Sequence, residues 1–250
     1  MRYIQAQKEK FRLCVITPIH NTSLTEIEKK RLKISLKHLK PHQHLFVRPK
    51  SHKVFPVSSF SNSKTIFFDD AYFRSRSEYS RMLLNKNFYR KFSKYTHMLI
   101  LQTDAIIIKD LNKDYLIDYD YIGAPWIPEK KIKIYNSKLF INTKRLPFIR
   151  GEKISVGNGG LSLRKISSMI KLMSLIERNY PYLANGDYNE DTVISYLVKA
   201  HGFSVPLSKV AQEIFCEQGA IGLNTVPKVN GFHALNRFNP KLESHLLRKQ

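Results

Sequence analysis

Asp104 is the residue of this chain whose position best suits phosphate chemistry. It comes two residues after the end of the run His97–Gln102, whose apolar composition and length predict a buried strand. Ligands of open α/β sheets collect at the carboxyl ends of the strands, where a carboxylate can hold Mg²⁺ or Mn²⁺ against a diphosphate. Asp is also common as a turn cap after a strand, so Asp104 alone leaves a purely structural role open.

The segment Gly157-Asn158-Gly159-Gly160 is the second candidate, because glycine allows a backbone to approach a ligand closely. It lacks the Gly-Lys-Ser/Thr ending of a phosphate-binding P-loop and does not match Gly-x-Gly-x-x-Gly. A tight turn before a strand at Leu161–Leu163 is the structural alternative.

Two further candidates are Asn189-Glu190-Asp191 and His233. The acidic pair stands at the expected start of a helix, where a carboxylate serves either as a cap or as a general base that takes a proton from a sugar hydroxyl. His233 lies in Gly231–Asn236, and imidazole is an ordinary metal ligand when it has partners. A packed, hydrogen-bonded histidine is the alternative.

The elements that must position these residues are apolar runs typical of strands and amphipathic runs typical of helices. A β-α-β opening is predicted by a strand over Phe11–Ile19, a helix that starts near Ser23 in a capping-box pattern, and a strand over Leu45–Val47. Further strands are expected at Thr65–Phe68, His97–Gln102 and Ala105–Ile108, and helices at Glu78–Phe92, Lys165–Arg178 and Asn189–His201.

Composition bounds the class of protein. The chain has 250 residues and 42% hydrophobic residues, enough for a sizeable core in one large domain or two small ones. No apolar run approaches the length of a membrane span, and Met1–Lys10 lacks a signal-peptide core. We therefore expect a cytoplasmic protein, free or at the inner membrane surface. Cys14 is expected to be a buried free thiol.

Charge is the strongest bulk feature. Forty-two Lys and Arg residues against 20 Asp and Glu residues give a net charge of +22, which favours polyanionic partners such as anionic lipid, phosphate-rich glycolipid or nucleic acid. A solvated basic surface without a partner is the alternative. Residues 128–153 concentrate basic side chains and are expected to form a long, partly mobile loop, and the tail beyond Asn239 is expected to be basic and loose.

The order of several short motifs resembles an uncharacterised bacterial glycosyltransferase-like domain family over residues 11–238. The two most specific motifs are Tyr121-Ile122-Gly123-Ala124-Pro125-Trp126 and the block from Gly157 to Arg164, which reads GNGGLSLR. More distantly, the layout is similar to the GT-A superfamily of nucleotide-sugar glycosyltransferases. The resemblance implies an α/β fold with a Rossmann-like nucleotide-binding half and a mixed central sheet flanked by helices. It also implies one domain, 1–250, divided into a nucleotide-binding half (11–126), a basic loop (127–153), an acceptor half (154–238) and a basic tail (239–250).

In that superfamily an Asp-x-Asp motif after a central strand binds ribose and metal, and here it reads Gln102-Thr103-Asp104. The second carboxylate is kept and the first is an amide, so Mn²⁺ or Mg²⁺ is the implied cofactor while metal-independent action stays open. His233 is the counterpart of a late histidine that completes the metal site. Asp191, in preference to Glu190, is the implied general base of a single, inverting displacement.

The remaining roles implied by the resemblance concern donor and acceptor. The donor site takes in the early strand end Thr17-Pro18-Ile19, together with Tyr79 and Arg81 from a Tyr-x-Arg motif. The sugar or acceptor site takes in the following residues: Trp126, Asn158, Gly159, Gly160 and Arg164.

The implied function is transfer of a sugar from a nucleoside-diphosphate sugar, such as a UDP-sugar, to a glycan or lipid-linked glycan in bacterial surface polysaccharide or lipopolysaccharide synthesis. The basic loop would face the donor or an anionic membrane surface. Three readings compete: a basic nucleic-acid-binding protein, a nucleotidyltransferase on a related fold, and a sugar-binding domain without activity. No nucleic-acid-binding module is recognisable in the sequence.

Overall fold

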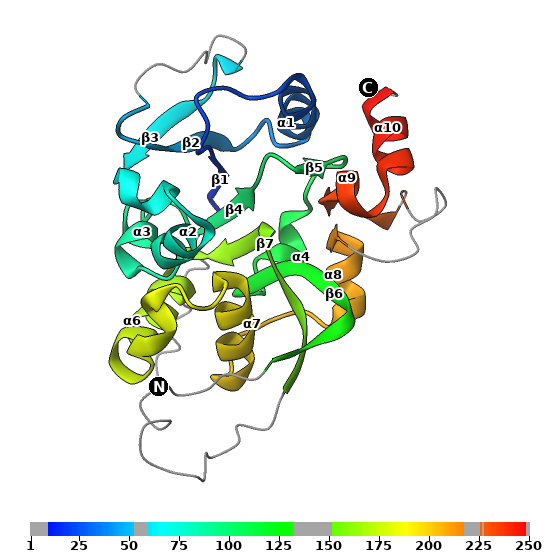
Figure 1. The fold of residues 1–250 in the computed structure, drawn as a ribbon. Helices are drawn as coiled ribbons and strands as arrows, with labels where there is room; N and C mark the ends of the chain where they lie inside the picture. The colour runs from blue at the N-terminus through cyan, green and yellow to red at the C-terminus, as the bar shows by residue number, and fades with distance from the viewer. Residues whose placement is uncertain (1–9, 53–59, 133–151, 218–225, 227, 249–250) are drawn as a thin grey trace, which may run out of the picture.

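A computed structural model describes residues 10–52, 60–132, 152–217, 226 and 228–248. Its centre is a six-stranded mixed sheet in the order β3-β2-β1-β4-β7-β6 (Figure 1). A second sheet of three short strands, in the order β5-β9-β8, lies beside it. The chain is therefore a mixed α/β protein, as the sequence predicts.

The predicted β-α-β opening is confirmed. Strand β1 (Leu13–Pro18) pairs in parallel with β2 (Gln43–Pro49), and helix α1 (Glu26–His38) connects them. The capping box that starts α1 uses Thr25 and Glu28, so the expected start near Ser23 is two residues early. Both pairs match the Ser/Thr-x-x-Glu pattern, and only Thr25 accepts the N3 backbone hydrogen bond.

The parallel half of the sheet is completed by β3 (Lys64–Phe68) and β4 (His97–Leu101). Between them lie the short turn η2 (Asp70–Phe73) and two helices, α2 (Arg76–Leu83) and α3 (Lys86–Arg90). The single helix expected over Glu78–Phe92 is thus wrong. Helix α2 ends with Leu84 as its C-cap. The Asn85 side chain then caps α3 by accepting a hydrogen bond from the backbone N–H of Asn87.

The other half of the sheet is a long antiparallel pair. Strand β6 (Tyr121–Ile132) pairs with β7 (Glu152–Lys165), and β7 pairs with β4. The basic loop expected over 127–153 is therefore shorter, because β6 continues to Ile132 and β7 begins at Glu152. The rest of that loop lies outside the described residues. Likewise, the strand expected at Leu161–Leu163 is only the end of β7.

Helices α6 (Ile166–Asn179) and α7 (Glu190–Ala200) agree with the sequence, and the turn η3 (Pro181–Asn185) joins them. Helix α4 (Lys113–Leu116) precedes β6, and α8 (Ser208–Ile214) leads into β8 (Phe215–Cys216). The small sheet is made of β5 (Ala105–Ile107), β8 and β9 (Gly231–His233).

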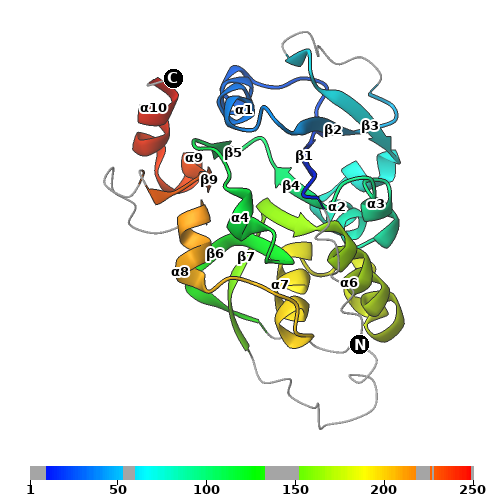
Figure 2. The same ribbon diagram turned by 180° about the vertical axis from the view of Figure 1, so that it is seen from behind.

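The chain ends in two ordered helices, α9 (Leu235–Phe238) and α10 (Pro240–Arg248). The loose tail expected beyond Asn239 is therefore wrong up to Arg248. Leu242 and Leu246 of α10 are buried against Ile34 of α1 and the small sheet, and Figures 1 and 2 show α10 beside α1.

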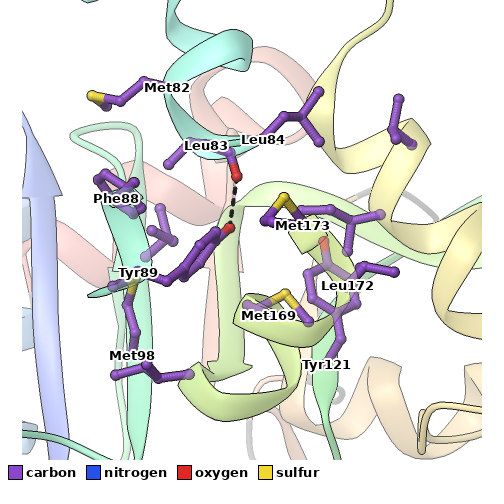
Figure 3. Packing of buried hydrophobic residues seen from close by; sticks show 14 of the residues in the cluster. Met82, Leu83, Leu84, Phe88, Tyr89, Met98, Tyr121, Met169, Leu172 and Met173 are labelled. Carbon is purple, nitrogen blue, oxygen red and sulfur yellow. Dashed lines mark hydrogen bonds between the residues drawn. The ribbon is translucent and has the colours of Figure 1, made fainter. Parts of the chain in front are cut away.

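Alternating residues of the central strands are buried on opposite faces. Met98 and Ile100 of β4 belong to a cluster covered by α2, α3, α6 and α7, whereas Leu99 and Leu101 belong to a cluster with α1 and β5. Figure 3 shows the first cluster, in which the Tyr89 hydroxyl donates to the Leu83 carbonyl at 2.9 Å. Cys14 is buried and unbridged, as expected. No helix of the described residues has the length and apolar character to cross a bilayer.

Candidate active site

A cavity of about 670 Å³ opens beyond the carboxyl ends of β1 and β4. These two strands are parallel neighbours, so their ends meet at one edge of the sheet. Pro18 and Ile19 line the cavity after β1, and Gln102, Thr103 and Asp104 line it after β4. The sequence therefore predicted the correct edge of the sheet.

Cations outnumber carboxylates in the cavity wall. Four arginines line it: Arg31 of α1, Arg74 just before α2, Arg76 at the start of α2 and Arg237 of α9. Two carboxylates, Glu28 and Asp104, line it as well. A cavity with this excess of guanidinium groups favours phosphate ligands.

Asp104 lies between two basic groups. Its Oδ1 is 3.2 Å from Nε2 of His233, and its Oδ2 accepts a hydrogen bond from the Arg237 guanidinium at 2.9 Å. Burial raises the pKa of Asp104, but His233 and Arg237 outweigh that effect and hold the pKa below its ordinary value. The carboxylate is thus ionised and only 18% exposed.

His233 is buried between two acids. Its Nδ1 is 3.1 Å from Oε1 of Glu217, and Glu217 also accepts a hydrogen bond from the Asn158 amide at 2.7 Å. Burial lowers the pKa of His233, yet Asp104 and Glu217 more than compensate and raise the pKa to about 9. Without a bound metal the imidazole is therefore a cation at neutral pH.

The pair Asp104 and His233 fits a divalent cation. The Nε2 atom of His233 is buried and has no hydrogen-bond partner among the described residues, even though Asp104 is close. Two ligands of one Mn²⁺ or Mg²⁺ ion lie about 3 Å apart when each bond is ~2.1 Å. A ligating histidine also commonly donates its other ring N–H to a carboxylate, the role that Glu217 is placed to fill.

The protein supplies only part of a coordination shell. Among the described residues, no three His, Cys, Asp or Glu side chains converge on one point. Mg²⁺ is often held by one or two carboxylates and completed by substrate phosphates and water. The Gln102 amide adds an oxygen here: a Cβ placed on Gly160 would lie 2.2 Å from His233 Nε2 and 2.5 Å from Gln102 Oε1, so both atoms face that glycine.

The glycine-rich segment lies in β7, between Gln102 and His233 on one side and the start of α7 on the other. Asn158 Oδ1 accepts a hydrogen bond from the Gly160 N–H at 2.8 Å, which fixes the segment locally. Gly159 leaves room for Glu190, whose Oε1 would be 2.2 Å from an added Cβ. Gly160 likewise leaves room for His233, whose Nε2 would be 2.2 Å from an added Cβ. The Gly159 N–H donates a hydrogen bond to Asp191 Oδ2 at 3.4 Å. His233, which lies 3.2 Å from Asp104, and Asp191 therefore flank one pair of glycines.

Glu190 and Asp191 have different environments. Glu190 is buried and pairs with the fully buried Arg164 at 3.1 Å. Burial and the neighbouring Asp191 raise the pKa of Glu190, while Arg164 opposes them. Asp191 is partly exposed. Of the two acids, Asp191 is the one that can meet a ligand, and Glu190 is a structural partner of Arg164.

Ten residues expected at the ligand do not line the cavity: Thr17, Arg81, Trp126, Asn158, Gly159, Gly160, Arg164, Glu190, Asp191 and His233. Four of the ten, Arg164, Thr17, Arg81 and Trp126, make contacts that give them a structural role. Arg164 is 0% exposed, and its guanidinium donates to the Tyr89 hydroxyl and the Gly159 carbonyl as well as to Glu190. Thr17 is buried and bonded to His44 Nε2 at 2.9 Å. An arginine or a threonine near the end of a strand has the right chemistry for phosphate, but these two side chains are buried in the core. The expected contacts of Arg164 and Thr17 with substrate are therefore wrong.

The other two are Arg81 and Trp126. Arg81 does not line the cavity and pairs with Glu78 one turn earlier on α2, so its expected donor contact stays a prediction. Trp126 is buried in the core and its ring covers Gly157, where an added Cβ would lie 2.1 Å from the ring. Core packing, not sugar stacking, accounts for Trp126. Tyr79, by contrast, lines the cavity, and its buried hydroxyl interacts with the Gln102 side chain.

Several site residues were missed. Glu217 follows a strand of two residues, and Arg237 lies in a segment expected to carry only His233 as a site residue. Arg31 sits in the middle of an amphipathic helix, and Arg74 and Arg76 look like ordinary surface charges. The one sequence signal was the position of Glu217 directly after the apolar run Ile214–Cys216, a weaker form of the Asp104 pattern.

Comparison with known proteins gives a family and no function. No curated protein matches the chain closely enough to count as a relative. The family model described as "Protein of unknown function (DUF5672)" matches residues 62–233, which is more than half of the chain and runs from before β3 to His233. The chain therefore belongs to the DUF5672 family of proteins of unknown function.

Proposed function

We propose that this protein is a glycosyltransferase with a GT-A-like site, which moves a sugar from a nucleoside-diphosphate sugar to a hydroxyl of a glycan or glycolipid. One observation carries the proposal: Asp104 and Nε2 of His233 lie 3.2 Å apart beside a cationic cavity at the carboxyl edge of the sheet. The resemblance of the motif blocks to nucleotide-sugar enzymes supports the same reading.

The donor's diphosphate would lie near Asp104. A bound Mn²⁺ or Mg²⁺ ion, held by Asp104 Oδ1 and His233 Nε2, would supply neutralisation of the diphosphate charge. Arg237 already contacts Asp104, and with Arg74 and Arg76 it offers guanidinium groups to the phosphate oxygens. These groups would stabilise the negative charge that grows on the leaving nucleoside diphosphate.

The nucleoside would occupy the part of the cavity formed by Pro18 and Ile19, and Gln102 would hydrogen-bond a ribose or sugar hydroxyl. The apolar side chains Leu24, Ile27 and Phe73, which line the same cavity, provide surface for a base. Tyr79 lines the same cavity beside Gln102, and its hydroxyl would add a hydrogen-bonding group for the donor.

Asp191 would accept the proton of the acceptor hydroxyl as that oxygen attacks the anomeric carbon. Its place at the start of α7, across Gly159 and Gly160 from the Asp104 site, supports attack from the side opposite the leaving group and hence inversion. The net charge of +22 supports an anionic acceptor, such as a lipid-linked glycan at the inner membrane surface.

A two-step experiment tests the proposal. A thermal-shift screen of nucleotide sugars with and without Mn²⁺ identifies donors, because a ligand that binds the folded state raises the melting temperature. Product analysis with the best donor follows. Transfer of sugar with release of nucleoside diphosphate is the expected result. Release of pyrophosphate would identify a nucleotidyltransferase instead, and stabilisation by no nucleotide sugar would reject the proposal.

A further inference from the structure

The turn that carries Asp104 has all three of its backbone carbonyls hydrogen-bonded. The Gln102 carbonyl accepts from the Ala105 N–H at 3.0 Å, and the Asp104 carbonyl accepts from the Ala234 N–H at 3.0 Å. The Thr103 carbonyl differs from both, because it accepts from a side chain, Nη1 of Arg31, at 3.1 Å. One of the three hydrogen bonds to the carbonyls of the turn therefore comes from a guanidinium group of α1.

Arg31 is itself fixed by the last helix of the chain. Its Nε and Nη2 atoms each lie 2.8 Å from Oε1 of Glu243 in α10, 212 residues away in sequence. Both side chains are nearly inaccessible, at 7% and 11% exposed. A guanidinium can bridge a carboxylate and a carbonyl at once because its donors form a rigid planar fork, which a lysine cannot reproduce.

A neighbouring residue on α1 reaches the same point. Glu28 lies one turn before Arg31, and the Thr103 side chain hydrogen-bonds to it. Burial raises the pKa of Glu28, but the hydrogen bonds from Thr103 and Thr25 outweigh this and leave the pKa below its ordinary value. The Ser35 hydroxyl, farther along α1, accepts from the Ile107 N–H at 2.9 Å and ties the helix to β5. Helix α1 therefore holds both sides of the turn.

Helix α9 adds the contact between Arg237 and Asp104, and Ala234 precedes that helix in the left-handed region at φ 54°. A non-glycine residue in that region carries strain that the surrounding contacts must offset. Here the Ala234 N–H reaches the Asp104 carbonyl. The C-terminal segment from β9 to α10 thus contacts the Asp104 turn directly, through Ala234 and Arg237, and indirectly, through Glu243 and Arg31.

We propose that Arg31 and Glu243 are a positioning pair, which holds the Gln102–Asp104 turn in its ligand-binding geometry and makes the C-terminal helix α10 part of the functional site. The proposal rests on the proposed function only for the identity of the ligand that Asp104 binds. The positioning itself is a property of the free protein, and so it can be measured without a ligand.

Two variants separate positioning from stability. Arg31→Lys keeps a cation for Glu243 but cannot also reach the Thr103 carbonyl. The double variant Arg31→Met/Glu243→Met replaces the buried pair with apolar groups of similar length, a change that leaves stability nearly intact in many proteins, whereas removal of one partner does not. The matched control is Lys86→Met/Glu177→Met, which removes an ion pair between α3 and α6, away from the cavity.

Amide hydrogen exchange in the free protein is the first readout. Faster exchange of the Ala105 and Ala234 N–H groups is expected in both Arg31 variants and in neither the wild type nor the control. The second readout is the affinity for UDP in the presence of Mn²⁺, measured by calorimetry. We expect this affinity to fall at least tenfold in both Arg31 variants, while the melting temperature of the double variant stays at the wild-type value. Unchanged exchange in a folded Arg31 variant overturns the positioning proposal, whatever the ligand data. Absence of UDP binding by the wild type, with the exchange result as expected, counts against the proposed function instead.

Discussion

The Nε2 atom of His233 lies 3.2 Å from Oδ1 of Asp104, yet it makes no hydrogen bond among the described residues. The other ring nitrogen is close to Glu217, so the imidazole is held between two carboxylates. A proton and a metal ion compete for Nε2 in this arrangement. A bound proton makes the ring a buried cation, whereas a metal ion binds only the neutral ring. The properties of this protein should therefore depend on pH and on divalent cations together.

Stability of the metal-free protein should fall at high pH because of His233. The pKa of His233 is raised from its ordinary value of 6.5 to about 9, so its stabilising contribution is complete below pH 6.5 and disappears as the pH rises through about 9. We expect the advantage of wild type over His233→Gln in urea unfolding to shrink by about 3 kcal/mol between pH 6 and pH 10. A difference that stays constant over this range would show that the imidazole is not charged in the folded state.

Asp104→Asn should abolish metal-dependent nucleotide binding and leave the fold intact. Asparagine keeps the shape of the side chain but removes the charge that a divalent cation and Arg237 need, so we expect UDP affinity in the presence of Mn²⁺ to fall at least about a hundredfold by calorimetry. Asp110→Asn is the matched control, since Asp110 is 86% exposed and contacts His38 on the far part of α1. Equal loss of affinity in both variants would indicate a general charge effect rather than ligation.

Glu190→Gln should act on stability. Arg164 is fully buried, and its charge is balanced by this carboxylate at 3.1 Å. Removing one partner of a buried ion pair leaves an uncompensated charge, so we expect a loss of roughly 3 kcal/mol in the free energy of unfolding. Denaturant titration measures it. A variant with wild-type stability would mean that Tyr89 and the Gly159 carbonyl alone satisfy Arg164.

Asp191→Asn should separate binding from transfer. The side chain is partly exposed and makes only a long contact of 3.4 Å with the Gly159 N–H, so its loss should change the melting temperature little. If Asp191 is the general base, donor affinity should stay near the wild-type value while the transfer rate falls about a hundredfold or more. Parallel loss of donor affinity and rate would assign Asp191 to the fold or to the donor site.

The sequence predicted the four parallel strands, and two of them, β1 and β4, are short, continuous apolar runs buried on both faces. It did not predict β6, and it predicted only the end of β7. It placed Asp104 at the correct sheet edge, for which position after a strand was sufficient. Local sequence patterns gave wrong predictions where contacts between distant parts of the chain determine the structure. Arg31 orders α10 through Glu243, although the tail alone reads as basic and loose. Arg164 reads as a ligand for phosphate, and only its burial against Glu190 shows a structural role.

The same limit applies to the site. Glu217 becomes important because β8 and β9 pair and bring it to His233, a relationship that the short strand does not reveal. The break between α2 and α3 has neither glycine nor proline, so a continuous helix was the natural expectation. The glycines of β7 were recognised as unusual, but the side chains that fill the space in front of them come from distant segments.

Gly160→Ala tests directly whether the space in front of Gly160, which His233 and Gln102 fill, belongs to the ligand site. The added Cβ would lie 2.2 Å from His233 Nε2 and 2.5 Å from Gln102 Oε1, and the buried imidazole has little room to retreat between Asp104 and Glu217. We expect a loss of about 1–3 kcal/mol in stability together with loss of the Mn²⁺-dependent thermal shift by UDP. Gly202→Ala is the control: an added Cβ there meets nothing within 4 Å, but φ +70° disfavours alanine, so it should lose roughly 1 kcal/mol and keep the shift. If Gly160→Ala also keeps the full shift, the ligand does not bind at Asp104 and His233.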